Sequence, residues 1–535
     1  MHTTRRVLRR FARLMNLHDD FNILLVKHRM LRSDSRSFIP NENDAAVPSS
    51  RNIAGQGLAR NFMLSQTFVR DFSTLTGKEP PEPRSLPVFG TMLDLILAGG
   101  AKKLHEYVDK RHRELGPVYR EQIGPVRAVF VNSAAEYRKI LLDLAGPMPR
   151  NFLPESWQLY NEIRGQNRGL LFMDGEEWLH HRRILNNVMI KPDPMEFLCT
   201  PCQESAKNLT EKWKAYSQIG CTIPKLEHHL YQWSIEVMLA VMIGSRWRDC
   251  KPQLRSEIDY VAMMVHQIFE YSATLTIIPP KLAMKFKLPI WTKFVKIVDT
   301  VLERVHNLVP KMIQLSNGDG LLQMITNYGI CDDMAGRIIT DFIIAAGDTT
   351  SVAMQWMLLL LSGRPELQDQ LFHDIKNLSA KEILEHKLLR NVRKETLRLY
   401  PVAPFLVRYL PTDAIIGGYL VPKGELIVMS LYSSSRDEKN FPRPNEFWPE
   451  RWMKTKESLP HYQEVNDARA SLPFATGLRN CVGRKLAITQ MSLTLAELIK
   501  NFKIECENRD SIEMILHLVS VPSKPIKLKL TDREI

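Results

Sequence analysis

The chain has 535 residues, of which 44% are hydrophobic and 24% are charged, so it has ample material for a large globular core. Its seven cysteines are scattered without the spacing of a disulfide framework, which argues against a small secreted scaffold and favours a reducing compartment. The formal net charge of +13 would suit a nucleic-acid-binding protein, but residues 1–70 hold twelve Lys or Arg and only five Asp or Glu. Much of the basicity is therefore an N-terminal feature, and no nucleic-acid partner is expected.

The first residues resemble a targeting segment. Val7, Phe11 and Leu14 are spaced to share one face of a helix. Before the first acidic residue the chain carries five arginines: Arg5, Arg6, Arg9, Arg10 and Arg13. An arginine-rich, acid-poor and amphipathic start is typical of a mitochondrial transit peptide, and the alternative is a disordered basic tail. We assign residues 1–70 to a transit peptide and disordered segment, and we find no run of about 18 apolar residues that would predict a membrane anchor.

A proline-rich segment follows at residues 71–90. Proline fixes φ, so a high density of prolines favours an extended and stiff backbone, and the prolines here are Pro80, Pro81, Pro83 and Pro87. By itself such a segment would be a linker. We expect it to lead into a single domain that spans residues 91–535.

A helix is predicted over residues 175–187. Trp178 and Arg182 are four residues apart and therefore lie on one face of it. On a surface helix this pair would form only a cation–π contact. The following residues, 200–330, have mostly helical spacing, interrupted by a turn at 277–280, and show no motif that carries chemistry.

A long buried helix is predicted from Asp332 or Asp333, which can cap its start, to Gly363. It is apolar nearly all round, yet its middle contains small residues next to Asp348 and Thr349. A buried acid and alcohol need partners. The Thr349 hydroxyl could simply bond back to the preceding turn, and the alternative is that both side chains have a functional role.

Another helix, ended by Pro401, carries Glu395 and Arg398 three positions apart. Residues 402–418 alternate and turn like strands and contain Arg408. Arg451 follows some fifty residues after Glu395. Two groups of basic residues flank these elements, and their default interpretation is a solvated surface: Arg390, Arg393 and Lys394 in one group, Arg484 and Lys485 in the other.

Cys481 lies between two glycines just ahead of a predicted helix. The positive end of a helix dipole favours a thiolate, and Arg479 adds a fixed positive charge two residues earlier. A thiolate is a ligand for a soft metal or for haem iron. Taken alone, however, a cysteine near a glycine turn is most often structural.

The spacing around this cysteine resembles the haem-ligand loop of the haem-thiolate monooxygenases, the cytochromes P450. Six positions fit the family pattern Phe-x-x-Gly-x-Arg-x-Cys-x-Gly-x-x-x-Ala: Phe474, Gly477, Arg479, Cys481, Gly483 and Ala487. With the other motifs, the resemblance covers about residues 80–530. It implies a mainly α fold with small β-sheets, in which haem b is buried between the long helix and the cysteine loop.

The resemblance also implies roles for the residues named above. Cys481 would be the axial ligand of the haem iron. The cofactor would further be bound by Trp178, Arg182, Arg408, Phe474 and Arg479. Thr349 and Asp348 would be catalytic in oxygen activation and proton relay, although Ala346 stands where the family usually has glycine. Glu395, Arg398 and Arg451 would form a buried structural triad.

The mitochondrial branch of the family implies further expectations. Electrons would come from an adrenodoxin-like ferredoxin with its reductase, and the ferredoxin would dock on the basic residues Arg390, Arg393, Lys394, Arg484 and Lys485. The enzyme would be a monomer in peripheral contact with the matrix side of the inner mitochondrial membrane. It would use O₂ to hydroxylate a small lipophilic substrate.

The substrate is suggested only by resemblance. Residues 343–350 and 475–481 look most like those of insect ecdysteroid 2-hydroxylases, which implies steroid hydroxylation in moulting-hormone synthesis. One alternative is an insect mitochondrial monooxygenase that oxidises lipophilic toxins. Another class, the haem-thiolate isomerases and haem sensors, needs no acid–alcohol pair, so Asp348 and Thr349 argue against it.

Overall fold

The computed structural model describes residues 77–165, 169–316, 318–453 and 465–534. The predicted transit peptide, residues 1–70, lies outside the described residues. Residues Thr74–Ile535 form one compact unit, and the following description concerns that unit alone.

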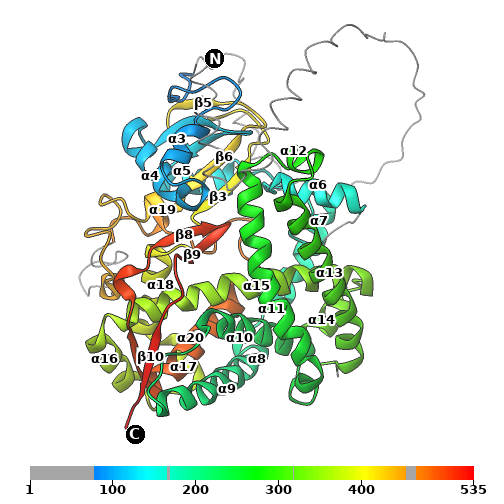
Figure 1. Cartoon of the computed structure of the whole chain (residues 1–535), viewed down its shortest axis with the longest axis vertical. Helices are drawn as coiled ribbons and strands as arrows, with labels where there is room; N and C mark the ends of the chain where they lie inside the picture. Colours follow the sequence, from blue (N-terminus) through cyan, green and yellow to red (C-terminus); the bar gives the residue numbers. More distant parts are fainter. Residues whose placement is uncertain (1–76, 166–168, 317, 454–464, 535) are drawn as a thin grey trace, which may run out of the picture. The chain divides into compact units, whose positions relative to one another are not determined.

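Helices make up most of this unit, as the sequence predicts (Figure 1). The helices are α3 (Met92–Leu97), α4 (Leu104–Leu115), α5 (Ala134–Arg138), α6 (Glu155–Arg164), α7 (Gly175–Leu185), α8 (Pro194–Phe197), α9 (Cys199–Gln218), α10 (Leu226–Ile243), α11 (Trp247–Ile277), α12 (Pro280–Lys285), α13 (Pro289–Leu315), α14 (Leu321–Asn327), α15 (Asp332–Ser362), α16 (Pro365–Ile375), α17 (Ala380–Glu385), α18 (Lys387–Leu399), α19 (Leu431–Ser434) and α20 (Arg484–Asn501). The turn predicted at 277–280 is confirmed, because α11 ends at Ile277 and α12 begins at Pro280.

Four small sheets complete the fold. Their strands are β1 (Val118–Ile123), β2 (Val126–Val131), β3 (Phe405–Tyr409), β4 (Ala414–Ile416), β5 (Tyr419–Val421), β6 (Leu426–Ser430), β7 (Phe502–Cys506), β8 (Met514–His517), β9 (Val519–Pro522) and β10 (Leu528–Asp532). The largest sheet has the order β1-β2-β6-β3, with β2 and β6 parallel and the other neighbours antiparallel. The three remaining sheets are the pairs β10-β7, β4-β5 and β8-β9. Arg408 of β3 pairs with Ile427 of β6, so the large sheet fixes the position of this arginine.

Helix α15 lies at the centre of the core and crosses the molecule in Figure 1. Its 31 residues would span about 46 Å at 1.5 Å per residue. It packs against α10, α11, α13, α18 and α20. It is long and apolar enough to cross a membrane by composition, but 78% of its most apolar window is buried inside the protein. The α15 sequence is therefore apolar because it is a core helix, as predicted.

The ends of α15 differ in detail from the prediction. Cys331 is the residue that precedes the helix, so Asp332 and Asp333 lie within the first turn rather than at the cap. In the first turn their negative charges still interact favourably with the positive end of the helix dipole. Gly363 follows the last residue of the helix as predicted. Its φ is −92°, so the helix ends without a residue in the left-handed conformation at this position.

The proline-rich segment runs along the large sheet. The Arg120 amide of β1 donates to the Pro81 carbonyl at 2.9 Å, and Gly90 forms a bridge to Ile123 at the end of the same strand. A Cβ added at Gly90 would lie 1.9 Å from the Gln122 carbonyl oxygen, so only glycine allows this approach. The segment is thus held on the sheet by backbone hydrogen bonds.

Candidate functional site

The cysteine loop is built against the backbone of another segment. The Cys481 amide donates to the Phe474 carbonyl at 2.9 Å, which closes the loop. Gly477 has φ of +81°, and a Cβ there would lie 2.4 Å from the Leu141 carbonyl oxygen. Gly477 is therefore required by a close backbone approach and by its conformation. Helix α20 begins directly after the loop, with Gly483 as its N-cap residue.

The Cys481 side chain is accessible to solvent although protein surrounds it closely. Burial raises the pKa of its thiol, against the opposing effects of the Gly483 amide and of Arg182 and Arg484. The helix N-terminus and the nearby arginines favour the thiolate, as expected from the sequence, but burial opposes them. A metal ion that replaces the thiol proton would hold this group as a thiolate.

Helix α7 brings Trp178 and Arg182 to the loop. Both side chains are buried on one face, at 2% and 5% exposure, and a π-helical turn, Asn186–Ile190, continues the helix. Arg182 donates to Asn186 Oδ1 at 2.8 Å and to Asn480 Oδ1, the residue next to Cys481. Burial lowers the pKa of Arg182 to about 10. The predicted helix face is confirmed, and it is an interior face rather than a surface one.

Two further arginines lie in the same region. Arg479 stacks over the Trp178 ring at 4.1 Å and forms an ion pair with Asp174. Arg408, 6% exposed, donates to its neighbouring carbonyl Val407 O at 2.6 Å, and its contact to Asn151 Oδ1 is long, at 3.5 Å. Burial, reinforced by the positive charge of Arg479, lowers the pKa of Arg408 to about 10.

The charges of this cluster do not balance. Asp174 compensates Arg479, but within the described part of the chain no carboxylate lies within ion-pair distance of Arg182 or Arg408. Buried cations are costly unless an anion pairs with them. Of these two uncompensated guanidinium groups, Arg182 lies near the accessible Cys481 sulfur and Arg408 lies near Arg479. Together with the sulfur they fit a ligand that carries two carboxylates and a thiolate-binding metal. The residues present therefore fit haem, with its two propionates and its iron.

The acid and the alcohol of α15 point to different surroundings. Asp348 is fully buried and accepts a hydrogen bond from Tyr231 of α10 at 2.7 Å. Thr349 is half-buried, and its hydroxyl donates to the Ala345 carbonyl, one turn earlier, at 2.7 Å. The back-bonded alternative for Thr349 is thus present in this structure. Its oxygen keeps lone pairs with which it can still accept a hydrogen bond.

The structure brings Glu395, Arg398 and Arg451 together, all with fully buried side chains. Arg398 donates to both Glu395 oxygens at 2.8 and 2.9 Å, and Arg451 donates to one of them at 2.9 Å. The remaining donors of the two guanidinium groups are satisfied by backbone carbonyls of Ser435, Pro442, Arg443, Pro444 and Glu446. The triad thereby joins α18 to the loop that contains Arg451.

The basic residues do not form one exposed surface. Arg390 and Arg484 are exposed, whereas Lys394 is half-buried, 4.9 Å over the Trp452 ring, and Lys485 donates to the Lys191 and Pro192 carbonyls. Arg393 is 9% exposed and donates to Ser492 Oγ of α20 at 2.5 Å. The assignment of Arg393 to a solvated docking face is wrong, because this residue lies between α18 and α20 and connects them.

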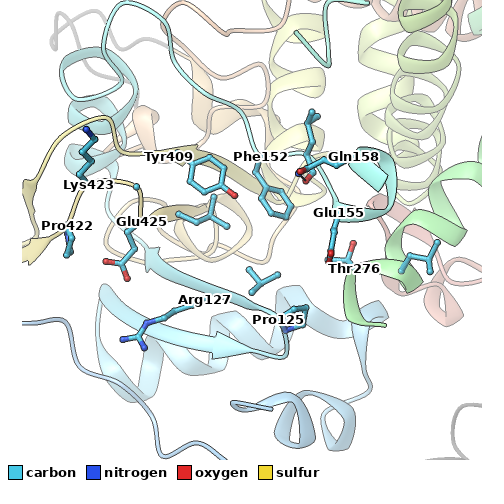
Figure 2. A pocket seen from close by; sticks show the side chains of 15 residues that line it. Pro125, Arg127, Phe152, Glu155, Gln158, Thr276, Tyr409, Pro422, Lys423 and Glu425 are labelled. Carbon is cyan, nitrogen blue, oxygen red and sulfur yellow. Dashed lines mark hydrogen bonds between the residues drawn. The ribbon is translucent and has the colours of Figure 1, made fainter. Parts of the chain in front are cut away.

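A cavity of about 540 Å³ lies beside the strand that carries Arg408 (Figure 2). Tyr409 of β3 and Phe152 face it together, and Arg127, Glu155 and Glu425 supply charged groups around it. Because successive side chains of a strand point to opposite faces, Tyr409 in the cavity places Arg408 on the other face. The size is within the range of small-molecule sites.

Comparison with known proteins decides the family. The family model described as Cytochrome P450 matches residues 80–530, which include all the helices described above and all but the end of the last strand, β10. The chain belongs to the cytochrome P450 family. The sequence-based assignment and the mainly helical fold are thereby confirmed, and the family is one of haem-dependent monooxygenases.

Several relatives of this P450 carry names that indicate mitochondria. Cytochrome P450 315a1, mitochondrial, of Drosophila melanogaster is 37% identical over 475 residues, which cover 85% of this chain and 88% of the relative. The cholesterol side-chain cleavage enzyme, mitochondrial, of Oncorhynchus mykiss is 27% identical over 90% of this chain and 95% of the relative. The 1,25-dihydroxyvitamin D(3) 24-hydroxylase, mitochondrial, of Rattus norvegicus is 24% identical over 85% and 89%. This P450 is thus similar to the mitochondrial class.

Some residues of the site did not stand out in the sequence. Asn186 and Asn480 orient Arg182, and both could have been suspected, since one lies four residues after that arginine and the other adjoins Cys481. Tyr231 and His266, which lie against Asp348, are more than 80 residues away from it in sequence. No local pattern connects them, so only the packing of α10 and α11 on α15 could find them.

Proposed function

We propose that this cytochrome P450 is a mitochondrial steroid hydroxylase that inserts one oxygen atom of O₂ into a C–H bond of an ecdysteroid, at position 2. The observation that carries the monooxygenase assignment is the pair of buried, uncompensated arginines in a chain of this family, Arg182 near Cys481 and Arg408 near Arg479. Haem b, when bound, would supply the binding and reductive activation of O₂.

The residues of the site would hold that group from three directions. Cys481 would be the iron ligand, on a loop closed by the hydrogen bond to Phe474. Arg182 and Arg408 would pair with the propionates, where the planar guanidinium fork matches a carboxylate. Trp178 would line the same region. Arg479, already paired with Asp174, would mainly hold Trp178 and the cysteine loop in place and add its charge to the propionate region.

Thr349 and Asp348 would handle protons. The Thr349 hydroxyl can accept a hydrogen bond while it donates to the Ala345 carbonyl, and Asp348 is the residue that precedes Thr349 in α15. Because hydroxylation consumes protons as well as electrons, an acid with access to a proton source is needed in the site. The fully buried Asp348 is the acid that we assign to this role.

The ecdysteroid substrate is supported by resemblance and by relatives. Residues 343–350 and 475–481 look most like insect ecdysteroid 2-hydroxylases. Two relatives are named for cholesterol and for a vitamin D compound. A mitochondrial oxidase of lipophilic toxins is the alternative.

The partner proposed for electron delivery is an adrenodoxin-like ferredoxin with its reductase. Arg390 and Arg484 are exposed and could attract an acidic protein, and charge complementarity speeds such an encounter. Lys394 and Lys485 flank them at half-buried positions. The buried Arg393 would hold α18 and α20 at a fixed spacing, and with them the two exposed arginines.

The proposed location is the matrix side of the inner mitochondrial membrane, reached by a transit peptide within residues 1–70 and followed by the segment 71–90 and a monomeric domain 91–535. Peripheral membrane contact is supported by large apolar side chains exposed near the start of the described chain and on α12: Leu86, Val88, Phe89, Leu97, Leu282 and Met284. Exposed apolar groups of this size mark sites of contact with a partner or a lipid surface.

The steroid assignment is tested with purified holoprotein, a mitochondrial ferredoxin, its reductase and NADPH. We expect 2-deoxyecdysone to shift the haem spin-state spectrum and to be converted to its 2-hydroxylated product. Absence of both the shift and the product would exclude this substrate. A spectral shift with rearranged product and no NADPH consumption would instead indicate an isomerase.

The role of Cys481 is tested by Cys481→Ser, which should abolish the thiolate-type spectrum of the reduced carbon monoxide complex and the activity. Cys331→Ser is the matched control because Cys331 is exposed and lies at the start of α15. An unchanged spectrum in Cys481→Ser would contradict the haem-thiolate assignment.

A further inference from the structure

Asp348 is buried on the side of α15 that packs against α10 and α11. Its side chain has no exposed surface, and its Oδ1 atom accepts the Tyr231 hydroxyl at 2.7 Å. Its Oδ2 atom has no hydrogen-bond partner among the residues that the structure describes. One oxygen of the carboxyl is therefore tied to α10, while the other remains available to a further group.

The Tyr231 hydroxyl has a second neighbour. The Nδ1 atom of His266, on α11, lies 2.9 Å from Tyr231 Oη and 3.7 Å from Asp348 Oδ1. Because the hydroxyl hydrogen is donated to Asp348, the Tyr231 oxygen acts as acceptor and His266 Nδ1–H acts as donor. His266, Tyr231 and Asp348 thus form one directed hydrogen-bond chain across three helices.

His266 connects this chain to the outside of the core. About a third of its side chain is exposed, at 35%, whereas the Asp348 side chain at the other end is at 0%. The Tyr231 residue between them is buried, at 4% exposure. A proton can therefore reach His266 from solvent without a change of fold and is then separated from Asp348 by a single hydroxyl group.

The charges around His266 favour its protonated form. It faces Glu227 of α10, Glu270 of its own helix α11, and Asp348 of α15. Burial opposes the charged imidazolium, but the nearby carboxylate of Asp348, with the two glutamates, raises the pKa of His266 above its ordinary value.

On the remaining side lies His517 of β8, with its ring centre 5.5 Å from that of His266. Burial lowers the pKa of His517 to about 4, and the charge of Lys102 acts in the same direction, against Glu270. His517 is therefore neutral at physiological pH and adds no repulsion to a protonated His266. Its own ring nitrogens have no hydrogen-bond partner in the described structure.

We propose that His266 and Tyr231 form the proton-uptake path that reloads Asp348 during turnover. The protonated imidazole gives its Nδ1 proton to Tyr231 Oη as the Tyr231 O–H proton passes to Asp348 Oδ1, so the imidazolium becomes neutral, the tyrosine is unchanged and the carboxylate becomes a carboxylic acid. Solvent then reprotonates His266. This inference rests on the proposed monooxygenase function, which consumes protons at the site, and it adds two positioning and relay residues to it.

A purely structural role for Tyr231 is the competing explanation, since any buried carboxylate needs a donor. The two explanations differ in what they require of His266. A structural donor does not need a half-exposed histidine behind it or a negative environment that keeps this histidine charged. A relay needs both, and both are present.

The test uses the full-length holoprotein with ferredoxin, reductase and NADPH, and the variants Tyr231→Phe and His266→Gln. Matched controls are Tyr271→Phe on α11 and His228→Gln on α10, neither of which is hydrogen-bonded to Asp348 in the described structure. Hydrogen peroxide released per NADPH is measured without substrate, and 2-hydroxylated product per NADPH is measured with 2-deoxyecdysone. Haem content and the reduced carbon monoxide spectrum show whether each variant is folded. If Tyr231→Phe loses haem, the proposed path is judged from His266→Gln alone, because His266 is partly exposed and its substitution should disturb the core less.

We expect both variants to lower proton-dependent turnover by about 10- to 100-fold, at or below the range of a general acid, while the controls stay within about twofold of the wild type. Wild-type turnover should fall as pH rises through the elevated pKa of His266, since only the protonated imidazole donates. This decrease at high pH should be absent from the pH profile of His266→Gln. If Tyr231 and His266 had only a structural role, the decrease would remain in the variant.

Wild-type coupling and an unchanged pH profile in both variants would overturn the path, even if Asp348→Asn abolished turnover. The substrate-free measurement does not depend on the steroid assignment, so a wrong substrate leaves it unaffected. If the wild type itself consumed no NADPH with O₂, the proposed monooxygenase function would fail, and the path would fail with it.

Discussion

Two groups of buried arginines in this protein differ in how their charge is compensated. Arg398 and Arg451 share the carboxylate of Glu395 and donate their remaining protons to backbone carbonyls. Arg182 and Arg408 are also buried but have only amide and carbonyl oxygens as acceptors in the described structure. In the first group each guanidinium therefore contacts a carboxylate. The second has an excess of positive charge that only an added anion would compensate, and this difference separates a structural cluster from a ligand site.

The largest expected effect comes from breaking the first group. Glu395→Gln keeps the size of the side chain but leaves two guanidinium groups buried without a counter-charge. Removing one partner of a buried ion pair costs about 3–5 kcal/mol, a large share of a typical free energy of unfolding of about 5–15 kcal/mol. We expect a severe loss of soluble holoprotein and a lower urea midpoint.

The control for this change is Glu446→Gln, which removes the carboxylate of an exposed pair with Arg443. Exposed ion pairs contribute about 0–1 kcal/mol, so this variant should unfold close to the wild type. Equal stability of Glu395→Gln and the wild type would show that the triad does not support the fold.

The second prediction concerns Arg182 and Arg408, where the expected change in the stability of the haem-free protein has the opposite sign. Arg182→Met or Arg408→Met removes a buried cation that lacks an anion, so the haem-free protein should be equally stable or more stable than the wild type in urea. With haem bound, each variant should lose a charge-assisted hydrogen bond worth about 1.5–3 kcal/mol. We expect haem to transfer to apomyoglobin about 10- to 100-fold faster.

These two measurements sharpen the comparison, because the same substitution should leave the haem-free protein at least as stable as the wild type and yet weaken its hold on haem. If Arg182→Met and Arg408→Met destabilised the haem-free protein and left the rate of haem loss unchanged, the two arginines would belong to the structural class with Arg398 and Arg451. The site would then need another source of charge for the propionates.

The smallest expected effect concerns the exposed basic residues that we propose as the ferredoxin-binding site. Arg390→Glu and Arg484→Glu should each raise the KM for ferredoxin about three- to tenfold at low ionic strength, and the effect should shrink near 0.5 M salt because ions screen exposed charges. Arg393→Met should instead lower the thermal midpoint, since it removes the link to Ser492. A salt-dependent KM in Arg393→Met would contradict its assignment as a buried connector.

Arg393 shows why sequence alone misassigned one member of this group. It lies three residues after Arg390 and next to Lys394, and composition presents the three as one basic cluster. Helix α18, however, is buried over most of its length, because it packs against α15, α20 and the loop that contains Arg451. Whether a charged side chain on such a helix meets water depends on these neighbours, which are distant in sequence.

The long helix was predictable for the opposite reason. Its apolar composition over 31 residues, the acids in its first turn and the glycine after its last residue are local features, and local features determine where a helix begins and ends. The Trp178–Arg182 face of α7 and the end of α18 before Pro401 follow from the same kind of evidence.

The sequence by itself determined the chemistry of this protein: the cysteine in its glycine–arginine loop, the acid–alcohol pair and the arginines that accompany them are spaced within single segments, where short-range geometry is enough to read them. Only the tertiary structure decided how these groups are compensated. It pairs Arg479 with Asp174, leaves Arg182 and Arg408 without an anion, and places Tyr231 and His266 behind Asp348. The reason is physical: burial and charge balance depend on which distant segments pack together.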